Sequence, residues 1–322
     1  MHSNLPPPPP HHATRCILLL LLIWNLLLVA CAPLTPAVLP ADATASSVLP
    51  PSTTPAEASL PPAVPTATPV PFVESAAPSS PPQPVASCQQ QPGRLQLGAL
   101  EDPRLPKPMR YIVYLPPCYD QSGLHYPVLY LLHGLGYAED QWPRLGIAET
   151  ADRLVANGEI RPFIIVMPYN YGAEPPASDP FDDVLLDTLI PRVDAAYRTL
   201  PSRENRAIGG LSRGGGWAIH LGVRQYTAFA IVGAHSPAIF YADNATLKMR
   251  LLQISPEMMP RFYIDIGDAD QDLKPARAFE ALLEDLNIEH TWRLNIGAHT
   301  EDYWRAHVED YLRWYSAQFP GE

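Results

Sequence analysis

The stretch Gly210-Leu211-Ser212-Arg213-Gly214 decides the fold, because it fits a sharp turn between a strand and a helix. The preceding residues, Asn205 to Gly209, are typical of a strand, and the run from Gly216 to Leu221 is typical of a helix. A side chain two residues on either side of the serine would collide with the neighbouring strand or helix, which explains the glycines. The pattern predicts that Ser212 stands at a strained turn with its hydroxyl presented as a nucleophile. An ordinary glycine turn is the alternative.

Apolar runs typical of buried strands alternate with amphipathic runs typical of helices from Met109 onward. The other predicted strands cover residues 110–115, 127–132, 163–167, 228–232, 262–266 and 291–295. The predicted helices cover residues 148–156, 182–197, 214–223, 275–286 and 301–319. This alternation predicts an α/β protein, with a mostly parallel central sheet and helices on both faces. Functional residues of such a sheet are expected beyond the carboxyl ends of its strands.

Composition divides the chain and excludes one class of partner. The 322 residues carry 22 Lys and Arg against 33 Asp and Glu, for a formal net charge of −11. Because no basic stripe is visible, we expect no nucleic-acid partner. More than half of the 40 prolines precede Gly93, so the first ninety residues do not resemble a packed domain.

Residues 1–30 are expected to form a signal peptide of the lipoprotein type. Arg15 precedes an apolar run that is too short and interrupted for a membrane span but suits a secretory signal. The run ends in Leu28-Val29-Ala30-Cys31, which resembles a bacterial lipobox, so Cys31 is the expected lipidation site. An uncleaved anchor, or a plain signal with a chance cysteine, is the alternative.

Residues 31–86 are expected to form a disordered tether, and residues 87–322 the folded domain. The tether is rich in Pro, Ala, Ser and Thr, with almost no charged or aromatic residues. Such a segment buries too little apolar surface to offset the entropy of ordering, and its prolines favour extended conformations. The sequence therefore predicts an exported domain on the cell surface, joined to the membrane only through a lipid anchor.

Two cysteines, Cys88 and Cys118, remain in the predicted mature domain. An exported protein with two remaining cysteines is a candidate for one disulfide, with two free buried thiols as the alternative. We do not expect Cys118 to act as a nucleophile, because no partner histidine pattern accompanies it.

A glycine-rich turn, His133-Gly134-Leu135-Gly136, follows the strand predicted at 127–132. Its glycines let the backbone fold close over a ligand. We expect the N–H groups of Leu135 and Arg213 to face a developing oxyanion, as acyl transfer requires. An ordinary turn at a strand end is the alternative.

Four aspartates around the turn after residues 262–266 compete to orient a catalytic histidine. Asp265 lies inside the predicted strand and Asp268 in the turn, so Asp270 is favoured and Asp272 is next. Most members of this cluster have a plainer role as helix N-caps. A calcium loop of Asp268, Asp270 and Asp272 lacks the downstream spacing of an EF-hand, so no metal and no cofactor are expected.

His299, in the loop after the last predicted strand, is the expected general base. The chain order Ser212, Asp270, His299 is that of α/β hydrolases. His235 also follows a predicted strand and is the only rival, but it precedes the acid in sequence. Trp142, Trp217, His133 and His235 are candidate pocket residues, with Tyr169, Tyr171 and Trp304 as further aromatic candidates that could equally be core.

The sequence from about Met109 to Phe319 resembles the esterase D-like family of α/β hydrolases. The resemblance is carried by residues 114–120, 128–134, 189–191, 196–199 and 210–215. The family includes feruloyl and acetylxylan esterases, S-formylglutathione hydrolases, enterochelin esterases and mycolyltransferases. Its G-x-x-D turn matches Gly267 to Asp270 and its G-x-H segment matches His299. The family often has glycine where Cys118 stands, a departure that again suggests the disulfide.

The resemblance implies an α/β-hydrolase fold and a serine esterase that acts on carboxylic esters. Expected export argues against S-formylglutathione, a cytosolic thioester, as the substrate, whereas carbohydrate-linked acetyl or feruloyl esters and simple short-chain esters fit. A cell-envelope acyltransferase with the same triad is the alternative. An inactive surface binding module is a further one.

Overall fold

The computed structural model describes Cys88 and residues 91–321. These residues belong to the second of two compact units of the chain, Ala76–Glu322. The signal peptide, Cys31 and the tether lie outside the described residues, so those assignments stay predictions. In the part that is described, no helix has both the length and the apolar character needed to cross a membrane.

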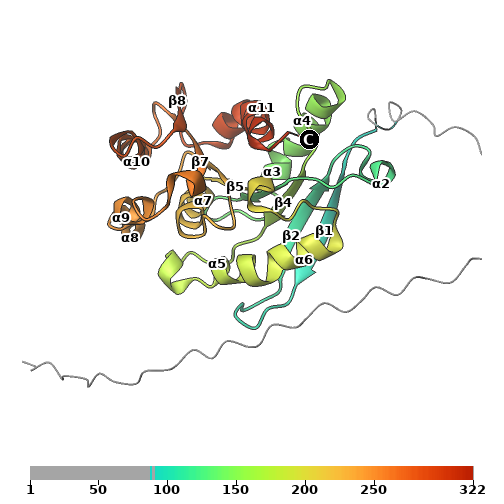
Figure 1. The fold of residues 1–322 in the computed structure, drawn as a ribbon, viewed down its shortest axis with the longest axis horizontal. Helices are drawn as coiled ribbons and strands as arrows, with labels where there is room; N and C mark the ends of the chain where they lie inside the picture. The colour runs from blue at the N-terminus through green and yellow to red at the C-terminus, as the bar shows by residue number, and fades with distance from the viewer. Residues whose placement is uncertain (1–87, 89–90, 322) are drawn as a thin grey trace, which may run out of the picture. The chain divides into compact units, whose positions relative to one another are not determined.

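An eight-stranded sheet runs through the domain in the order β1-β2-β4-β3-β5-β6-β7-β8 (Figure 1). Strand β2 pairs antiparallel with β1 and β4, and all other neighbours are parallel. The strands are β1 (Arg94–Leu100), β2 (Met109–Leu115), β3 (Val128–Leu132), β4 (Ile164–Pro168), β5 (Arg206–Leu211), β6 (Ile231–His235), β7 (Arg261–Gly267) and β8 (His290–Asn295).

Helices connect most of these strands, as expected for a parallel sheet. The α-helices are α2 (Tyr119–Ser122), α3 (Gln141–Arg144), α4 (Ile147–Ala156), α5 (Phe181–Val184), α6 (Ile190–Ala196), α7 (Arg213–Arg224), α8 (Tyr241–Asn244), α9 (Leu247–Leu251), α10 (Leu273–Asp285) and α11 (Glu301–Gln318). Three 3₁₀ helices are η3 (Pro176–Ser178), η5 (Arg203–Asn205) and η6 (Pro256–Met258), and η4 (Leu185–Leu189) is a π-helical segment.

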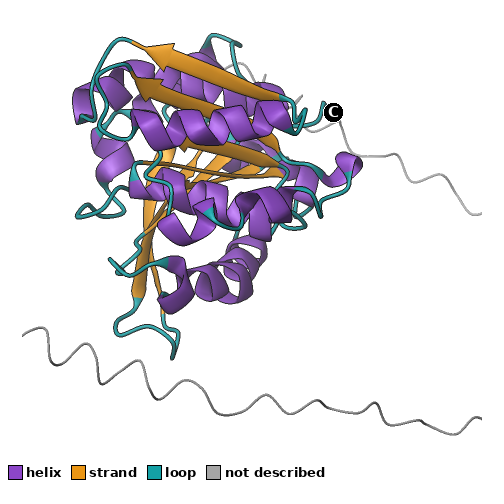
Figure 2. Cartoon of the chain, turned by 90° about the vertical axis from the view of Figure 1, so that its left-hand side faces the viewer, coloured by secondary structure: helices purple, strands orange, loops and turns teal. Residues whose placement is uncertain are grey.

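The helices cover both faces of the sheet (Figure 2), as predicted from the alternation of apolar and amphipathic runs. Helices α4 and α11 pack on one face, and α5, α6, α7 and α10 cover the other. Strand β3 contributes to both cores: Leu129 and Leu131 face α4 and α11, whereas Val128, Tyr130 and Leu132 face the opposite layer. Because neighbouring strand residues point to opposite faces, the continuous apolar run is explained by two-sided burial.

One predicted strand is displaced. The run 228–232 was expected to be a strand, but β6 begins at Ile231 and ends at His235. The N–H groups of Ala228 and Phe229 both donate to the Gln225 carbonyl, in a turn that follows α7. An apolar run does not distinguish a strand from a turn that buries a phenylalanine, and Phe229 is fully buried. The correction moves His235 from the loop into the strand.

The Cys88–Cys118 disulfide is present, with a Cα–Cα distance of 5.1 Å and a sequence separation of 30. It joins the chain ahead of β1 to the residue that precedes α2. Crosslinking a loop of this length restricts the unfolded chain, so the bond stabilises the folded domain chiefly through the unfolded state.

Replacing both cysteines, as Cys88→Ser and Cys118→Ser together, is expected to lower the free energy of unfolding by about 2–4 kcal/mol. Urea unfolding followed by circular dichroism measures the difference. The control is the unsubstituted domain with and without reductant, which should show the same loss. Equal stability of the two proteins under oxidising conditions would contradict a stabilising crosslink.

Candidate active site

Ser212 stands between β5 and α7, at the carboxyl edge of the sheet. Its backbone has φ 53° and ψ −121°, a conformation that side-chain-bearing residues rarely adopt. The Ser212 N–H donates to the His235 carbonyl, and the Ser212 carbonyl accepts from the N–H groups of Gly216 and Ala238. These bonds hold the strained turn in place.

The two glycines of the motif are required by close backbone approach. A Cβ atom at Gly210 would lie 2.5 Å from the Gly214 carbonyl carbon, and a Cβ atom at Gly214 would lie 2.4 Å from the Leu132 carbonyl oxygen. No other residue fits either position without moving β3 or α7. The glycines therefore let the strand, the turn and the helix meet at Ser212.

A chain of hydrogen bonds joins Ser212, His299 and Asp270. The Ser212 Oγ atom lies 2.8 Å from His299 Nε2, and His299 Nδ1 lies 3.0 Å from both carboxylate oxygens of Asp270. The Trp304 ring lies edge-on to the imidazole, with centroids 5.0 Å apart, and limits its movement. A histidine that donates from Nδ1 to a carboxylate presents an unprotonated Nε2 to the serine.

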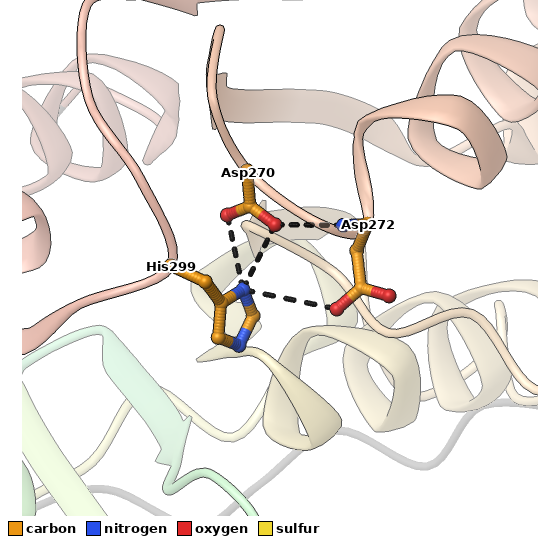
Figure 3. Close-up of side chains that lie close together, drawn as sticks. All are labelled: Asp270, Asp272 and His299. Atoms are coloured by element: carbon orange, nitrogen blue, oxygen red, sulfur yellow. Dashed lines mark hydrogen bonds and ion pairs between the residues drawn. The ribbon is translucent and has the colours of Figure 1, made fainter.

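Asp270 and Asp272 both approach His299 Nδ1 (Figure 3), but their environments differ. Asp272 is farther away, at 3.7 Å, and its backbone N–H donates to Asp270 Oδ1 at 2.8 Å. Burial would raise the pKa of Asp270, but hydrogen bonds led by that of His299 outweigh it, so this pKa lies below its ordinary value. Burial raises the pKa of Asp272. Asp270 is therefore the carboxylate better suited to stabilise an imidazolium.

The other two aspartates have separate structural partners. Asp265 is completely buried and accepts hydrogen bonds from Tyr303, Tyr311 and His235. Asp268 is exposed and accepts the Gly297 N–H at 3.0 Å, which fixes the loop that carries His299. Neither contacts His299.

The backbone N–H groups of Leu135 and Arg213 donate to no acceptor within the described part of the chain. Gly134, beside Leu135, approaches the nucleophile so closely that a Cβ atom there would lie 3.5 Å from Ser212 Cβ. The predicted oxyanion donors are therefore unpaired and adjacent to Ser212.

Two side chains fix the turn at residues 133–136, and one of them, Gln141, was not anticipated. Gln141 is fully buried and accepts the Gly134 N–H at 2.8 Å. His133 Nδ1–H donates to the Gly134 carbonyl at 2.8 Å, and its Nε2 accepts the Asn170 N–H at 2.9 Å. Burial lowers the pKa of His133, in keeping with a neutral ring that uses one nitrogen as donor and the other as acceptor.

A cavity of about 210 Å³ opens beside the nucleophile. Leu135 and Arg213 belong to its lining, whereas Ser212 and His299 do not, so it extends away from the reacting atoms. Its walls are largely aromatic and glycine-rich. The lining includes His133, Tyr137, Tyr169, Tyr171, Phe181 and Trp217, among which His133 and Trp217 are predicted pocket residues.

Two other predicted pocket residues lie in the core instead. Trp142 is buried, with its indole N–H donating to the Leu132 carbonyl at 2.9 Å. His235 is fully buried, bonded to Asp265 and stacked on Tyr311 with ring centroids 3.7 Å apart. The burial of His235 follows from the displacement of β6, because this strand ends at His235 and so places the residue inside the sheet. The position of Trp142 near a strand end did not show whether its ring would pack in the core or line a pocket.

Ser236 is a second residue that the sequence did not single out. It is fully buried at φ 47°, and its N–H donates to the Asp265 carbonyl at 2.7 Å. The Ser236 hydroxyl lies near the Asp270 carboxylate and helps to lower the pKa of Asp270. It makes no hydrogen bond of ordinary geometry in the described domain. The sequence signal that could have found Ser236 is the pair Ser236-Pro237, which directly follows β6.

Asp270, Asp272 and His299 offer ligand atoms within 4.8 Å of one another, so a metal ion is a chemical possibility at this cluster. His299 Nδ1 already has a partner in Asp270, and a metal ion would have to replace that hydrogen bond. Asp268, which the calcium-loop alternative requires, does not belong to the cluster.

Comparison with known proteins gives the family. The family described as "Putative esterase" matches residues 103–320. An endo-1,4-beta-xylanase/feruloyl esterase from Xylanibacter ruminicola is 32% identical over 182 residues, covering 53% of this chain and 24% of the relative. An esterase from Mycobacterium tuberculosis is 35% identical over 143 residues, covering 41% of this chain and 30% of the relative. The chain thus spans less than a third of either relative's length.

Solved structures confirm the α/β-hydrolase fold. A ferulic acid esterase superposes with a TM-score of 0.63 and 25% identity, covering 71% of this chain and 98% of that one. A ferulic acid esterase from Anaeromyces mucronatus, in complex with ferulic acid, has a TM-score of 0.57 and 22% identity, with 69% and 90% covered. The second likeness concerns the fold alone.

If His299 activates Ser212, a fluorophosphonate probe should label Ser212 covalently, with loss of fluoride, and His299→Ala should abolish labelling. Asp270→Asn should slow labelling by about 10³–10⁴-fold, because the imidazole loses its orienting charge. Mass spectrometry of the intact protein and of its peptides measures rate and position.

The matched control is Asp272→Asn, which should change the rate by less than about threefold, since its carboxylate is farther from Nδ1. A larger loss for Asp272→Asn than for Asp270→Asn would exchange the roles of the two carboxylates.

Proposed function

We infer that this protein, whose chain belongs to the esterase family matched over residues 103–320, is a serine esterase that hydrolyses carboxylic esters. The observation that carries this proposal is the hydrogen-bonded chain from Ser212 through His299 to Asp270, beside two unpaired backbone N–H groups. A nucleophile, a base, an orienting acid and oxyanion donors are the parts that acyl transfer needs.

In the proposed first step, Ser212 Oγ attacks the ester carbonyl carbon while its proton passes to His299 Nε2. The Asp270 carboxylate stabilises the imidazolium that results. The carbonyl oxygen becomes an oxyanion, which the N–H groups of Leu135 and Arg213 would stabilise. Collapse of the tetrahedral intermediate breaks the bond to the alcohol oxygen, and His299 returns its proton to that oxygen.

The acyl-enzyme is then hydrolysed by the same groups. A water molecule gives its proton to His299 as it attacks the acyl carbonyl, and the second tetrahedral intermediate expels Ser212 Oγ, which recovers the proton. The net reaction adds one water across the ester bond, so no cofactor is required.

The cavity beside the nucleophile favours an aromatic acyl group. Tyr169, Tyr171, Phe181 and Trp217 belong to its lining and give it an aromatic wall. An aromatic acyl group would pack against these rings. Together with the feruloyl esterase relative, these features support a hydroxycinnamoyl ester, carried by a carbohydrate, as substrate.

Export and anchoring complete the proposal. Cys31 would carry the lipid, and the Pro-rich residues 31–86 would hold the domain away from the membrane. The Cys88–Cys118 disulfide supports this, because such bonds persist outside the cytosol. An extracellular carbohydrate ester is a substrate that such a location would make accessible.

A panel of acetyl, butyryl and feruloyl esters tests the activity. Wild-type protein should release alcohol from all three, with the highest kcat/KM for the feruloyl ester, and Ser212→Ala should release none. Release would be measured by absorbance for chromogenic esters and by chromatography for feruloylated sugar.

Turnover that rises only when an alcohol or sugar acceptor is added would support the acyltransferase alternative. No covalent labelling and no turnover by the wild-type protein would contradict both and leave a binding module.

Cys31→Ser is expected to move the protein from the membrane fraction to the soluble or secreted fraction, because the thiol that accepts the lipid is lost. Fractionation with immunoblotting measures the shift. Cys16→Ser, in the apolar run of the predicted signal, is the matched control and should leave the protein with the membrane. Membrane retention of the Cys31→Ser variant would contradict lipid anchoring at this residue.

A further inference from the structure

The segment between β4 and α5, residues 169–180, forms a wall of the aromatic cavity and is packed loosely. It borders the 210 Å³ cavity through residues 169–173, and it also borders a second cavity of about 140 Å³. Leu105, Pro106 and Met109 line the far side of that second cavity. Because cavities border the segment on two sides, its polar contacts contribute to holding it in position.

Arg213 supplies polar contacts to the middle and the end of this segment. Its start is held separately, because the Tyr169 N–H donates to the Arg110 carbonyl, the Asn170 N–H to His133 Nε2 and the Tyr171 hydroxyl to the Pro108 carbonyl. The Arg213 guanidinium donates to the Glu174 carbonyl and lies 3.4 Å from the Asp179 carboxylate. The side chain is about nine-tenths buried, over the rings of Phe240 and Trp217 at 5.3 and 5.9 Å. Arg213 thus connects the helix after the nucleophile to the middle and the end of the wall.

Asp179 completes the connection from the segment's own side. Its carboxylate accepts the Phe181 N–H at 3.1 Å, at the start of α5. A Cβ atom at Gly172 would lie 1.9 Å from Asp179 Oδ2, so the glycine allows the two ends of the segment to meet there. Asp179 therefore fixes the segment as a closed loop as well as pairing with Arg213.

Both partners are desolvated, which makes the pair sensitive to loss of either member. Burial raises the pKa of Asp179 and lowers the pKa of Arg213, since each charge is partly removed from water. Removing one partner leaves the other buried and uncompensated, a larger loss than the pair's own attraction. The segment is then expected to move.

We propose that the Arg213–Asp179 pair determines acyl specificity, by holding residues 169–180 closed over the aromatic cavity. The proposal rests on the proposed esterase function. An aromatic acyl group would contact Tyr169 and Tyr171 on this wall and needs it in place. An acetyl group is too short to extend along the cavity and depends only on Ser212, His299 and the oxyanion donors.

Asp179→Asn tests the pair with an isosteric change that removes one charge. It should raise KM for a feruloyl ester about 10-fold or more, while kcat/KM for an acetyl ester changes by less than about threefold. Asp183→Asn, an exposed acid on the same helix as Phe181, is the matched control and should alter neither. Because the acetyl ester reports on the triad, retained acetyl turnover also shows that the variant is folded.

A double-mutant cycle adds a second readout. Arg213→Met should lower the feruloyl-to-acetyl selectivity as Asp179→Asn does, and the two changes together should lower it little further. Additive losses would indicate that the two residues act separately and would overturn the proposed role of the pair. So would an equal loss of both esters, or no loss of either, in Asp179→Asn.

Direct binding separates this proposal from the proposed function. Ferulic acid titrated into Ser212→Ala, followed by tryptophan fluorescence, should bind about 10-fold more weakly when Asp179→Asn is added. If wild-type protein turned over no ester, the esterase function would fail while this binding comparison still tested the pair. Unchanged binding of ferulic acid in the Asp179→Asn variant would overturn the proposed role of the pair, whatever the ester turnover.

Discussion

The strained backbone of Ser212 is the constraint on which the rest of the site depends. A positive φ at a residue with a side chain costs about 1–3 kcal/mol, so surrounding structure must hold it. That structure is the contact between Gly210 and Gly214 and the hydrogen bonds that tie Ser212 to His235, Gly216 and Ala238. The turn is thus stabilised by two neighbouring elements, β6 and α7.

A buried polar cluster fixes the elements that bring His299 to this serine. Asp265 on β7 accepts from His235 on β6 and from Tyr303 and Tyr311 on α11. Tyr315 reaches His235 Nε2 at 3.1 Å. Helix α11 begins two residues after His299, so the cluster ties the loop of the histidine to the strand that supports Ser212.

The sequence allowed much of the site to be predicted, because the chemistry of a triad depends on few residues at strand ends. Hydrogen bonds join Ser212, His299 and Asp270, and the N–H groups of Leu135 and Arg213 have no acceptor among the described residues. Their catalytic roles stay predictions. Trp142 and His235 were misplaced, since proximity to a strand end does not say whether a ring packs inward. The three-residue shift of β6, from the predicted 228–232 to Ile231–His235, shows the same limit for apolar runs.

By itself, the sequence determined the alternation of strands and helices, the glycines around Ser212 and the order of the three residues of the predicted triad. It also identified the two cysteines that form the disulfide. Only the tertiary structure distinguished the surroundings of Asp270 and Asp272, because two carboxylates two residues apart differ in burial and partners rather than in spacing. It alone also revealed the Arg213–Asp179 pair, since that contact joins residues 34 apart across the wall of a cavity.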